Sequence, residues 1–429
     1  MNHTIYKRKF NLPANHANNR SWLDSKKPSV QSYIAKNGSR LADPNQTESV
    51  YFEMSSHLHN ELKESTPELV EMFGKATEHV LNNPKYWHYF GFPDIYWDLA
   101  TKSFKKGDKP ISGRLDYSIT PDNGIKCYEY NADSASCLME CGYTQGAWSD
   151  ALALGSVGKN AGAETAHTIA DTWRKTLPPL TTVHFLHDDD EEERYHTLYM
   201  MQLAERAGMK CKEVINFNGY TFNNKGEIVD DEGQVVQHVW KTWSYITLLD
   251  KLRDANYHLH QSGNVRLIDI CFHHEIQVFE PIWTAIASNK AILPVLWELY
   301  PHHPYLLEST FELTNELRTI GYASKPVSGR CGENVTLHFP STDMNTDHDH
   351  WNDYYETETV TEVKASDGRF GNDNMIYQEL CSLPKCGDSY VQVNTFTTGS
   401  NGKYAGTVTR VDNTPIVGLE SGTYALRIV

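Results

Sequence analysis

The sequence predicts an α+β protein of two or three packed subdomains, and three observations support that prediction. Apolar residues recur at helical spacing through residues 50–107, where Pro67 predicts a helix start. Residues 181–214 have the pattern strand, acidic loop, helix and strand, which is typical of an α/β unit. From residue 319 onward, short strands and Gly-rich turns predominate. With 429 residues, the chain is also too long for one simple hydrophobic core.

The composition predicts a soluble protein of the cytoplasm. Mean hydropathy is −0.55, and no apolar run approaches the roughly 20 residues that a membrane helix needs. Residues 1–20 have basic side chains without an apolar core behind them, so they do not form a secretory signal. Eight cysteines without a dense framework are typical of reduced thiols. A formal net charge of −16 disfavours a nucleic-acid surface and fits a small cationic partner.

Four regions are predicted along the chain. Residues 1–50 are rich in Asn, Ser, Lys and Pro and predict an irregular arm. Residues 51–180 hold the helical lead-in and then a β-hairpin, and residues 181–265 form the α/β subdomain. Residues 266–429 hold strands, a helix and glycine turns, and within them the polar stretch 341–360 predicts a mobile loop.

The stretch GRLDYSITPDNGIKCYEYNAD, residues 113–133, predicts a β-hairpin around a Pro-Asp-Asn-Gly turn. Antiparallel register about this turn makes three cross-strand pairs, Thr120 with Ile125, Asp116 with Glu129, and Arg114 with Asn131. Because side chains alternate along a strand, the four polar residues share one face, and Tyr128 and Tyr130 lie on the other. Two directly opposed carboxylates repel, so we expect a positive charge between them.

Two interpretations fit this polar face. Asp116, Glu129 and Asn131 offer the hard oxygen ligands that Mg²⁺ prefers. Arg114 beside them could then contact a phosphate or carboxylate bidentately. In the alternative, the charges are solvated on a surface hairpin, and Arg114 only neutralises its neighbours.

A second motif, YASKPVSGRCGENVTL, spans residues 322–337 and places Lys325 at the end of a strand, before a glycine turn. Glycines let backbone N–H groups approach phosphate oxygens closely, and a lysine supplies positive charge. Lys290, which opens an apolar helix, adds a second cation. The motif is not a Walker A loop, because no Gly-Lys-Ser/Thr opens a helix. A plain strand-to-strand turn and a surface lysine would have the same appearance.

Isolated polar residues also interrupt apolar strands, namely Gln378, Gln392 and Arg410. Such groups need hydrogen-bond partners, which could be a nucleotide base or the neighbouring backbone. The acidic run Asp188–Glu193 closes a strand and opens a helix. It is either a solvated loop or a dock for a polycation.

The chain resembles the synthetase part of the glutathionylspermidine synthase family, which are ATP-grasp carboxylate–amine ligases. The resemblance runs from about residue 113 to 419, in order, and its motifs are rich in Trp and Tyr. They are YEYNADSASC, YHTLYMMQLAERAGM, VWKTW, VRLIDI, EPIWTAIASNKAILPVLWELYPHHPYLLES, GYASKPVSGRCGEN, IYQELCSLPK and VNTFTTG.

The resemblance implies that ATP phosphorylates the glycyl carboxylate of glutathione and that an amine of spermidine, or of a similar polyamine, attacks the acyl phosphate. It implies an ATP-grasp-like fold in circularly permuted order, in which the hairpin and an α/β substrate-binding subdomain precede the nucleotide-binding strands. In that fold Asp116, Glu129 and Asn131 would hold Mg²⁺. Arg114 would act as a catalytic residue that steadies the developing acyl phosphate.

The resemblance also implies the substrate contacts. ATP would be bound by Lys290, Lys325, Cys331, Gly332, Gln378, Gln392 and Arg410, with GRCGEN as the lid loop. Ser134 and Thr242 match family positions that hold glutathione. Glu192 and Glu193 match acidic residues near the glutathione and polyamine ends, and a carboxylate such as Glu192 could take the proton that the amine loses.

Two departures from the family bear on the reaction. Some members carry an upstream thiol amidase, whereas the first cysteine here, Cys127, lies in the hairpin, so we expect amide synthesis without hydrolysis. Members can carry further acidic groups near the C-terminus, where this chain has Glu420 and a short tail, so the identity of the amine stays open. Other functions also remain: a ligase with another acid and amine, a nucleotide-binding module without catalysis, and an ATP-independent hydrolase.

Overall fold

The computed structural model describes residues 5–12, 22–38, 48–122, 124–216, 219–340, 362–364, 368–371, 373–419 and 421–429. Strands within these ranges form sheets of four, four, five, six and two strands. None of the helices in these ranges combines the length and the apolar character that crossing a bilayer requires. All eight cysteine side chains are free thiols. The predicted loop 341–360 lies outside the described residues.

The six-stranded sheet holds the predicted hairpin and joins it to the far end of the chain. Its order is β20-β19-β18-β3-β4, and β17 also pairs with β18. These strands are β3 (Ser112–Ile119), β4 (Ile125–Asn131), β17 (Lys385–Cys386), β18 (Ser389–Thr398), β19 (Lys403–Asp412) and β20 (Gly422–Thr423). β3 lies between β4 and β18 and is therefore an internal strand, whereas β4 is an edge strand of the sheet.

The hairpin register agrees with the prediction at its polar end only. The two confirmed pairs are Asp116 with Glu129 and Arg114 with Asn131. Near the turn the prediction is wrong, because Ile125 lies opposite Ile119 and not Thr120. A β-bulge next to the polar pairs takes up the extra residue. It also separates the tyrosines that were predicted to share a face: the Tyr128 hydroxyl contacts the Cys381 carbonyl, whereas Tyr130 packs under helix α2.

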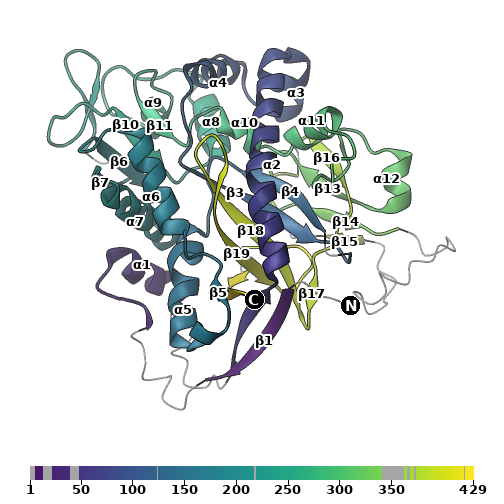
Figure 1. Cartoon of the computed structure of the whole chain (residues 1–429). Helices are drawn as coiled ribbons and strands as arrows, with labels where there is room; N and C mark the ends of the chain where they lie inside the picture. Colours follow the sequence, from purple (N-terminus) through teal and green to yellow (C-terminus); the bar gives the residue numbers. More distant parts are fainter. Residues whose placement is uncertain are drawn as a thin grey trace.

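Helix α2 (Ser56–Asn82) covers one face of this sheet, as Figure 1 shows. There Phe73 packs against Tyr130 with ring centroids 5.3 Å apart. The helix runs through Pro67, so the predicted helix start at that proline is wrong. A proline inside a helix costs about 3 kcal/mol. Burial of one face of α2 offsets that cost, and the Thr66 hydroxyl adds a hydrogen bond to the Leu62 carbonyl at 2.5 Å.

Regular elements also occur where the sequence predicts an irregular arm. β1 (Ile5–Asn11) pairs with β2 (Glu48–Met54), and α1 (Pro28–Asn37) packs on α7 through Tyr33 and Tyr195, whose ring centroids lie 5.2 Å apart. The arm prediction is therefore wrong for these described residues. Its polar composition concealed the few buried side chains that hold these elements in place. The other strands of the β1-β2-β21-β5 sheet are β21 (Leu426–Ile428) and β5 (Lys159–Asn160).

The predicted strand–helix–strand unit is confirmed as part of a parallel sheet of order β11-β10-β6-β7. Its elements are β6 (Thr182–His187), α7 (Glu191–Arg206), β7 (Lys210–Ile215), β10 (His238–Lys241) and β11 (Gln277–Phe279). β11 lies beyond residue 265, where the subdomain was predicted to end. A short hairpin of β8 (Thr221–Phe222) and β9 (Ile228–Val229) follows β7.

The five-stranded sheet comes from the predicted strand-rich region, in the order β12-β16-β13-β14-β15. Its strands are β12 (Ser309–Thr310), β13 (Tyr322–Pro326), β14 (Thr336–His338), β15 (Glu362–Lys364) and β16 (Met375–Glu379). The remaining α-helices are α3 (Trp87–Phe90), α4 (Asp94–Lys106), α5 (Gln145–Ala151), α6 (Thr165–Thr176), α8 (Tyr245–Asp254), α9 (Leu267–Cys271), α10 (Thr284–Ser288), α11 (Ile292–Leu299) and α12 (Asn315–Ile320).

Candidate active site

Arg114 and Asp116 form a buried ion pair on the polar face of the hairpin. Their exposed fractions are 4% and 1%, so the interpretation of a solvated surface hairpin is wrong. Arg114 Nε and Nη2 donate to the two Asp116 carboxylate oxygens at 2.7 and 2.9 Å, and Nη1 donates to the Ser136 carbonyl at 2.9 Å. Burial lowers the pKa of Arg114, but Asp116 outweighs burial and raises that pKa above its usual range. Each partner keeps the other from being an uncompensated buried charge.

Glu129, opposite Asp116, is neutralised by a lysine from another part of the chain. Lys290 Nζ lies 2.9 Å from a Glu129 carboxylate oxygen and donates to the Gly329 carbonyl at 2.5 Å. Burial raises the pKa of Glu129, but Lys290 and Lys325 outweigh burial and lower it to about 2. The expected positive charge is therefore present, and it comes from side chains on both sides of the carboxylate pair.

Two amide side chains connect these ion pairs. Asn131 Nδ2 donates to Asp116 at 3.2 Å and to Glu129 at 3.5 Å. Asn394 on β18 donates to Asp116 Oδ1 at 2.7 Å and to Gln392 Oε1 at 3.0 Å. Asn394 is fully buried, and its own Oδ1 accepts no hydrogen bond from the residues that the structure describes. Sequence reasoning missed Asn394, although an asparagine two residues after Gln392 on an apolar strand was a usable signal.

Lys325 and Gln378 form a second buried pair, on β13 and β16. Lys325 Nζ donates to Gln378 Oε1 at 2.6 Å and lies 5.0 Å from the centroid of the Tyr128 ring. Gln378 Nε2 donates to the Ser309 hydroxyl at 3.2 Å, so both ends of this amide have partners within the protein. Burial lowers the pKa of Lys325 to about 8, and the Glu129 carboxylate partly opposes that shift.

The glycine turn that follows β13 packs against the loop after β19. At Gly332, φ is +73°, and an added Cβ would lie 2.8 Å from Ile416 Cγ2 and 2.9 Å from the Val417 carbonyl oxygen. The turn therefore requires glycine at this position. Cys331 beside it is exposed. Arg330, in the same turn, donates to the Ser134 carbonyl at 3.0 Å and so connects the turn to the end of the hairpin.

Gln392 and Arg410 lie opposite each other on β18 and β19. Arg410 Nε donates to the Ser421 hydroxyl at 3.0 Å, and its Nη2 donates to the Gly418 carbonyl at 2.7 Å. Arg410 therefore holds the loop on which the glycine turn rests. Through Asn394, Gln392 is connected to the hairpin carboxylates.

Ser134 and Thr242 lie next to each other. Ser134 Oγ donates to the Thr242 carbonyl at 2.8 Å, and the Thr242 N–H donates to the Leu186 carbonyl at 3.2 Å. Thr242 Oγ1 is buried and has no hydrogen-bond partner in the described part of the chain, so it is available to a ligand. Thr242 follows β10 directly, which places it at the carboxyl edge of the parallel sheet, where α/β folds commonly bind ligands.

Glu192 and Glu193 lie in the first turn of α7, at the same edge of that sheet. Asp190 is the N-cap and accepts hydrogen bonds from both of their backbone N–H groups. The Glu192 carboxylate lies 3.3 Å from the ammonium of Lys36 in α1. The loop between β6 and α7 is tied to the end of β10 by Trp243 Nε1, which donates to Asp188 at 2.8 Å.

The predicted residues therefore form two connected groups. The hairpin group contains the carboxylates and amides with Arg114, Lys290 and Lys325, and the edge group contains Ser134, Thr242 and the start of α7. In the described part of the chain, no three His, Cys, Asp or Glu side chains are grouped so that they could hold a metal ion. The predicted magnesium set is of another kind, because it combines two carboxylates with an amide.

Comparison with known proteins gives the family. The sequence profile described as "Glutathionylspermidine synthase preATP-grasp" matches residues 24–428. This chain belongs to that family. The bifunctional glutathionylspermidine synthetase/amidase of Escherichia coli K12 is 35% identical over 418 residues, which cover 95% of this chain and 63% of that protein. The trypanothione synthetase of Crithidia fasciculata is 34% identical over 421 residues, covering 95% of this chain and 61% of that protein.

This member of the glutathionylspermidine synthase family thus spans less than two thirds of the length of those two relatives. A shorter relative, a putative acid–amine ligase of Haemophilus influenzae, is 24% identical over 396 residues that cover 87% of this chain and 88% of that protein. Among solved structures, the glutathione synthetase-like effector of Globodera pallida in its apo form has a TM-score of 0.52 at 12% identity, over 88% of this chain and 89% of that one. That likeness shows the same mixed α/β, ATP-grasp fold.

Proposed function

We propose that this protein joins the glycyl carboxylate of glutathione to an amine of spermidine, or of a similar polyamine, with ATP as the energy source. ATP would phosphorylate the carboxylate, and the amine would displace phosphate from the acyl phosphate, so that the products are the amide, ADP and phosphate. The observation that supports this most is the family match over residues 24–428. Within that match, two carboxylates and three cations meet on the buried face of one hairpin.

The hairpin group has the donors that a nucleotide and Mg²⁺ need. Asp116 and Glu129 supply carboxylate oxygens, and Asn131 lies within hydrogen-bond distance of both. Rotation of the Asn131 amide by half a turn would offer Oδ1 in place of Nδ2. Mg²⁺ bound there would neutralise charge that develops during phosphoryl transfer. Asn394 would keep Asp116 oriented, because it donates to Asp116 at 2.7 Å.

Lys290 and Lys325 would bind the phosphates, and the turn with Cys331 and Gly332 would close over them and exclude water. Lys290 would exchange its bond to Glu129 for a phosphate, which costs little because both partners are anionic. We propose that Gln392 and Arg410 complete the nucleotide pocket. Gln378 would act mainly by holding Lys325, since both ends of its amide already have partners.

Ser134 and Thr242 would hold glutathione at the edge of the parallel sheet, next to the hairpin. Arg114 would steady the developing acyl phosphate from the Ser136 side of the hairpin. Glu192 and Glu193 would attract the polyamine, and Glu192 would accept the proton that the amine loses.

The division into arm, lead-in, substrate subdomain and nucleotide-binding region, and the permuted order of the fold, belong to this proposal. The free thiols favour a reducing compartment such as the cytoplasm.

A second candidate is a ligase of the same chemistry that joins a different acid and amine. The observation that favours it is the Haemophilus influenzae relative, a putative acid–amine ligase of which this chain covers 88%. In that case the hairpin group would keep its role, and only the edge group would serve another acid.

Mass spectrometry of a reaction with ATP, glutathione and spermidine tests the proposal. We expect a product with the mass of the two substrates joined with loss of one water, formed in equal amount with ADP. Omission of ATP should abolish product. ADP release that requires glutathione but accepts no polyamine would favour the second candidate, and product formed without ATP would overturn both.

A further inference from the structure

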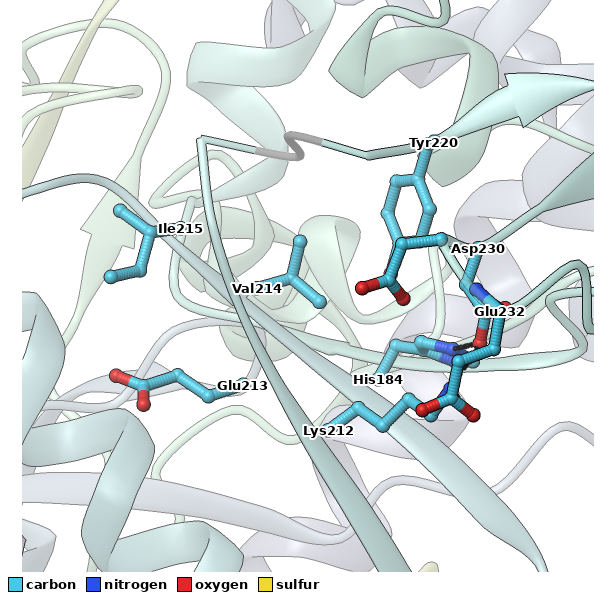
Figure 2. A pocket seen from close by; sticks show the side chains of 9 residues that line it. His184, Lys212, Glu213, Val214, Ile215, Tyr220, Asp230 and Glu232 are labelled. Atoms are coloured by element: carbon cyan, nitrogen blue, oxygen red, sulfur yellow. Dashed lines mark hydrogen bonds and ion pairs between the residues drawn. The ribbon is translucent and has the colours of Figure 1, made fainter.

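A pocket of about 430 Å³ lies in the α/β region, and the proposed reaction does not use it. Figure 2 shows its lining side chains, which come from β6, β7 and the segments next to β8 and β9. They are His184, Lys212, Glu213, Val214, Ile215, Tyr220, Asp230, Asp231 and Glu232.

The pocket is separate from the hairpin group. The order β11-β10-β6-β7 makes β7 the edge strand farthest from β11. Glu280, directly after β11, accepts hydrogen bonds from the N–H groups of Ile111 and Ser112 at the start of the hairpin, at 2.5 and 3.0 Å. The hairpin therefore borders the β11 side of this sheet, whereas the pocket is lined by β6 and β7 at its other side.

The pocket lining carries an excess of negative charge. Lys212 Nζ donates to Asp230 at 2.6 Å and to Glu232 at 2.8 Å, so one ammonium group is shared by two carboxylates. Glu213 is shared with Arg194 and His187 outside the pocket. Asp231 is exposed, and within the described residues no cation lies at ion-pair distance from it. The lining therefore has room for a further positive charge.

Two polar atoms, on side chains in this lining, are buried and have no hydrogen-bond partner among the described residues. They are the Tyr220 hydroxyl and His184 Nδ1, on side chains that are 7% and 1% exposed. His184 Nε2 lies 3.1 Å from Asp230 Oδ2 and donates to it, because an ionised carboxylate only accepts. In the neutral imidazole, Nδ1 is then the acceptor, and it accepts no hydrogen bond from the described residues. Leaving such buried groups unsatisfied is costly, which favours an occupant.

From this geometry we infer that the pocket binds a linear aliphatic amine in its cationic form, as a second amine site outside the ligation site. An ammonium group offers three N–H donors, and the lining includes the possible acceptors His184, Tyr220 and Asp231. Val214 and Ile215 form an apolar wall along which the methylene chain can lie. The inference does not rest on the proposed ligation reaction.

Isothermal titration calorimetry of the full chain with spermidine, without ATP and glutathione, tests this inference. Tyr220→Phe removes only the hydroxyl and should raise the Kd for spermidine about fivefold to tenfold. Asp231→Asn removes only the negative charge and should raise the Kd by a similar factor. Because salt screens an ionic contact, binding of spermidine to the unaltered protein should weaken at higher salt concentration. Asp98→Asn is the matched control, since Asp98 is an exposed carboxylate on α4. The Kd of this variant for spermidine should equal that of the unaltered protein.

The inference is overturned if spermidine does not bind, or if it binds with the same Kd in Tyr220→Phe, Asp231→Asn and the control. Circular dichroism of each variant checks that it is folded. A product assay on the same proteins separates the two proposals. Amide formation with unchanged spermidine binding in the pocket variants would overturn only the second amine site. Binding that depends on Tyr220 and Asp231 without any amide product would overturn only the ligation.

Discussion

Each carboxylate on the hairpin face has its own cation, but the two pairs differ in burial. Asp116 is 1% exposed and holds Arg114 through two hydrogen bonds, whereas the Glu129 side chain is 26% exposed and pairs with Lys290 through one contact. Loss of Asp116 leaves a buried guanidinium without a counter-charge. Loss of the Glu129 charge leaves a lysine that still donates to the Gly329 carbonyl. The two residues should therefore differ in their effect on stability.

We expect Glu129→Gln to lower turnover at least about 100-fold, because the proposed magnesium site loses an anionic ligand. It should also lower the free energy of unfolding, because Lys290 and Lys325 lose their carboxylate partner, but by less than loss of Asp116 does, because Lys290 keeps its hydrogen bond to the Gly329 carbonyl. Asp116→Ala should also abolish turnover, but it should lower the free energy of unfolding by about 3–5 kcal/mol. Product assays and chemical denaturation measure these effects, with Glu71→Gln on the exposed side of α2 as the control. Wild-type ligation by Glu129→Gln would exclude the metal assignment.

A pH dependence follows from Lys325, whose pKa burial lowers to about 8. Below that pH the ammonium is charged and can bind phosphate, and above it the positive charge is lost. We therefore expect kcat/KM for ATP, which reports the free enzyme, to fall above about pH 8. Lys325→Arg keeps its charge to higher pH and should remove this alkaline decline. An unchanged decline in an active Lys325→Arg variant would show that another group titrates.

At the scale of secondary-structure elements, the glycine turn after β13 packs against the loop after β19. Gly332 has a left-handed φ of +73° and leaves no space for a Cβ. Arg410 holds the opposing loop through Gly418 and Ser421. Placement of the turn over the lysines should depend on this contact.

Gly332→Ala should raise KM for ATP about fivefold or more, because the turn would be displaced from Ile416 and Val417. Gly387→Ala is the matched control, because its φ is +68° but nothing lies within 4 Å of an added Cβ. Steady-state kinetics of both variants separates loss of the contact from backbone strain alone. Equal KM values in the two variants would show that the packing of the turn is unimportant.

Sequence reasoning predicted local features better than partners distant in the chain. Alternation and the turn motif identified the hairpin, and they paired Asp116 with Glu129 correctly. They could not locate the bulge, because the alternation of residues along β4 does not mark its extra residue, Tyr128. Asn394 stood out locally as a polar residue on an apolar strand, but its role comes from lying opposite Asp116 on a strand about 280 residues later, and no local pattern encodes that pairing.

At the scale of the whole molecule, the sheets join segments from opposite ends of the chain. β21, from the last residues, pairs with both β2 and β5, and β18 pairs with β3. Such non-local pairing makes the fold depend on a few buried side chains that lie far from the site. It also explains why the first 50 residues looked irregular in sequence, since β1 is a strand only because β2 lies beside it.

Leu426→Ala tests this dependence. Leu426 is fully buried on β21, so truncation should lower the free energy of unfolding by about 2–5 kcal/mol. Val429→Ala is the control, because Val429 is 48% exposed and its truncation should cost less than about 0.5 kcal/mol. Urea denaturation measures both. Equal stabilities would mean that β21 is not part of the cooperative core.

The most direct test of the account is a crystal structure of the protein with Mg²⁺ and a non-hydrolysable ATP analogue. We expect a metal ion about 2.1 Å from carboxylate oxygens of Asp116 or Glu129, with Lys290 and Lys325 on the phosphates. A nucleotide bound elsewhere, with the Arg114–Asp116 and Lys290–Glu129 pairs unchanged, would contradict the assignment of the active site to the hairpin.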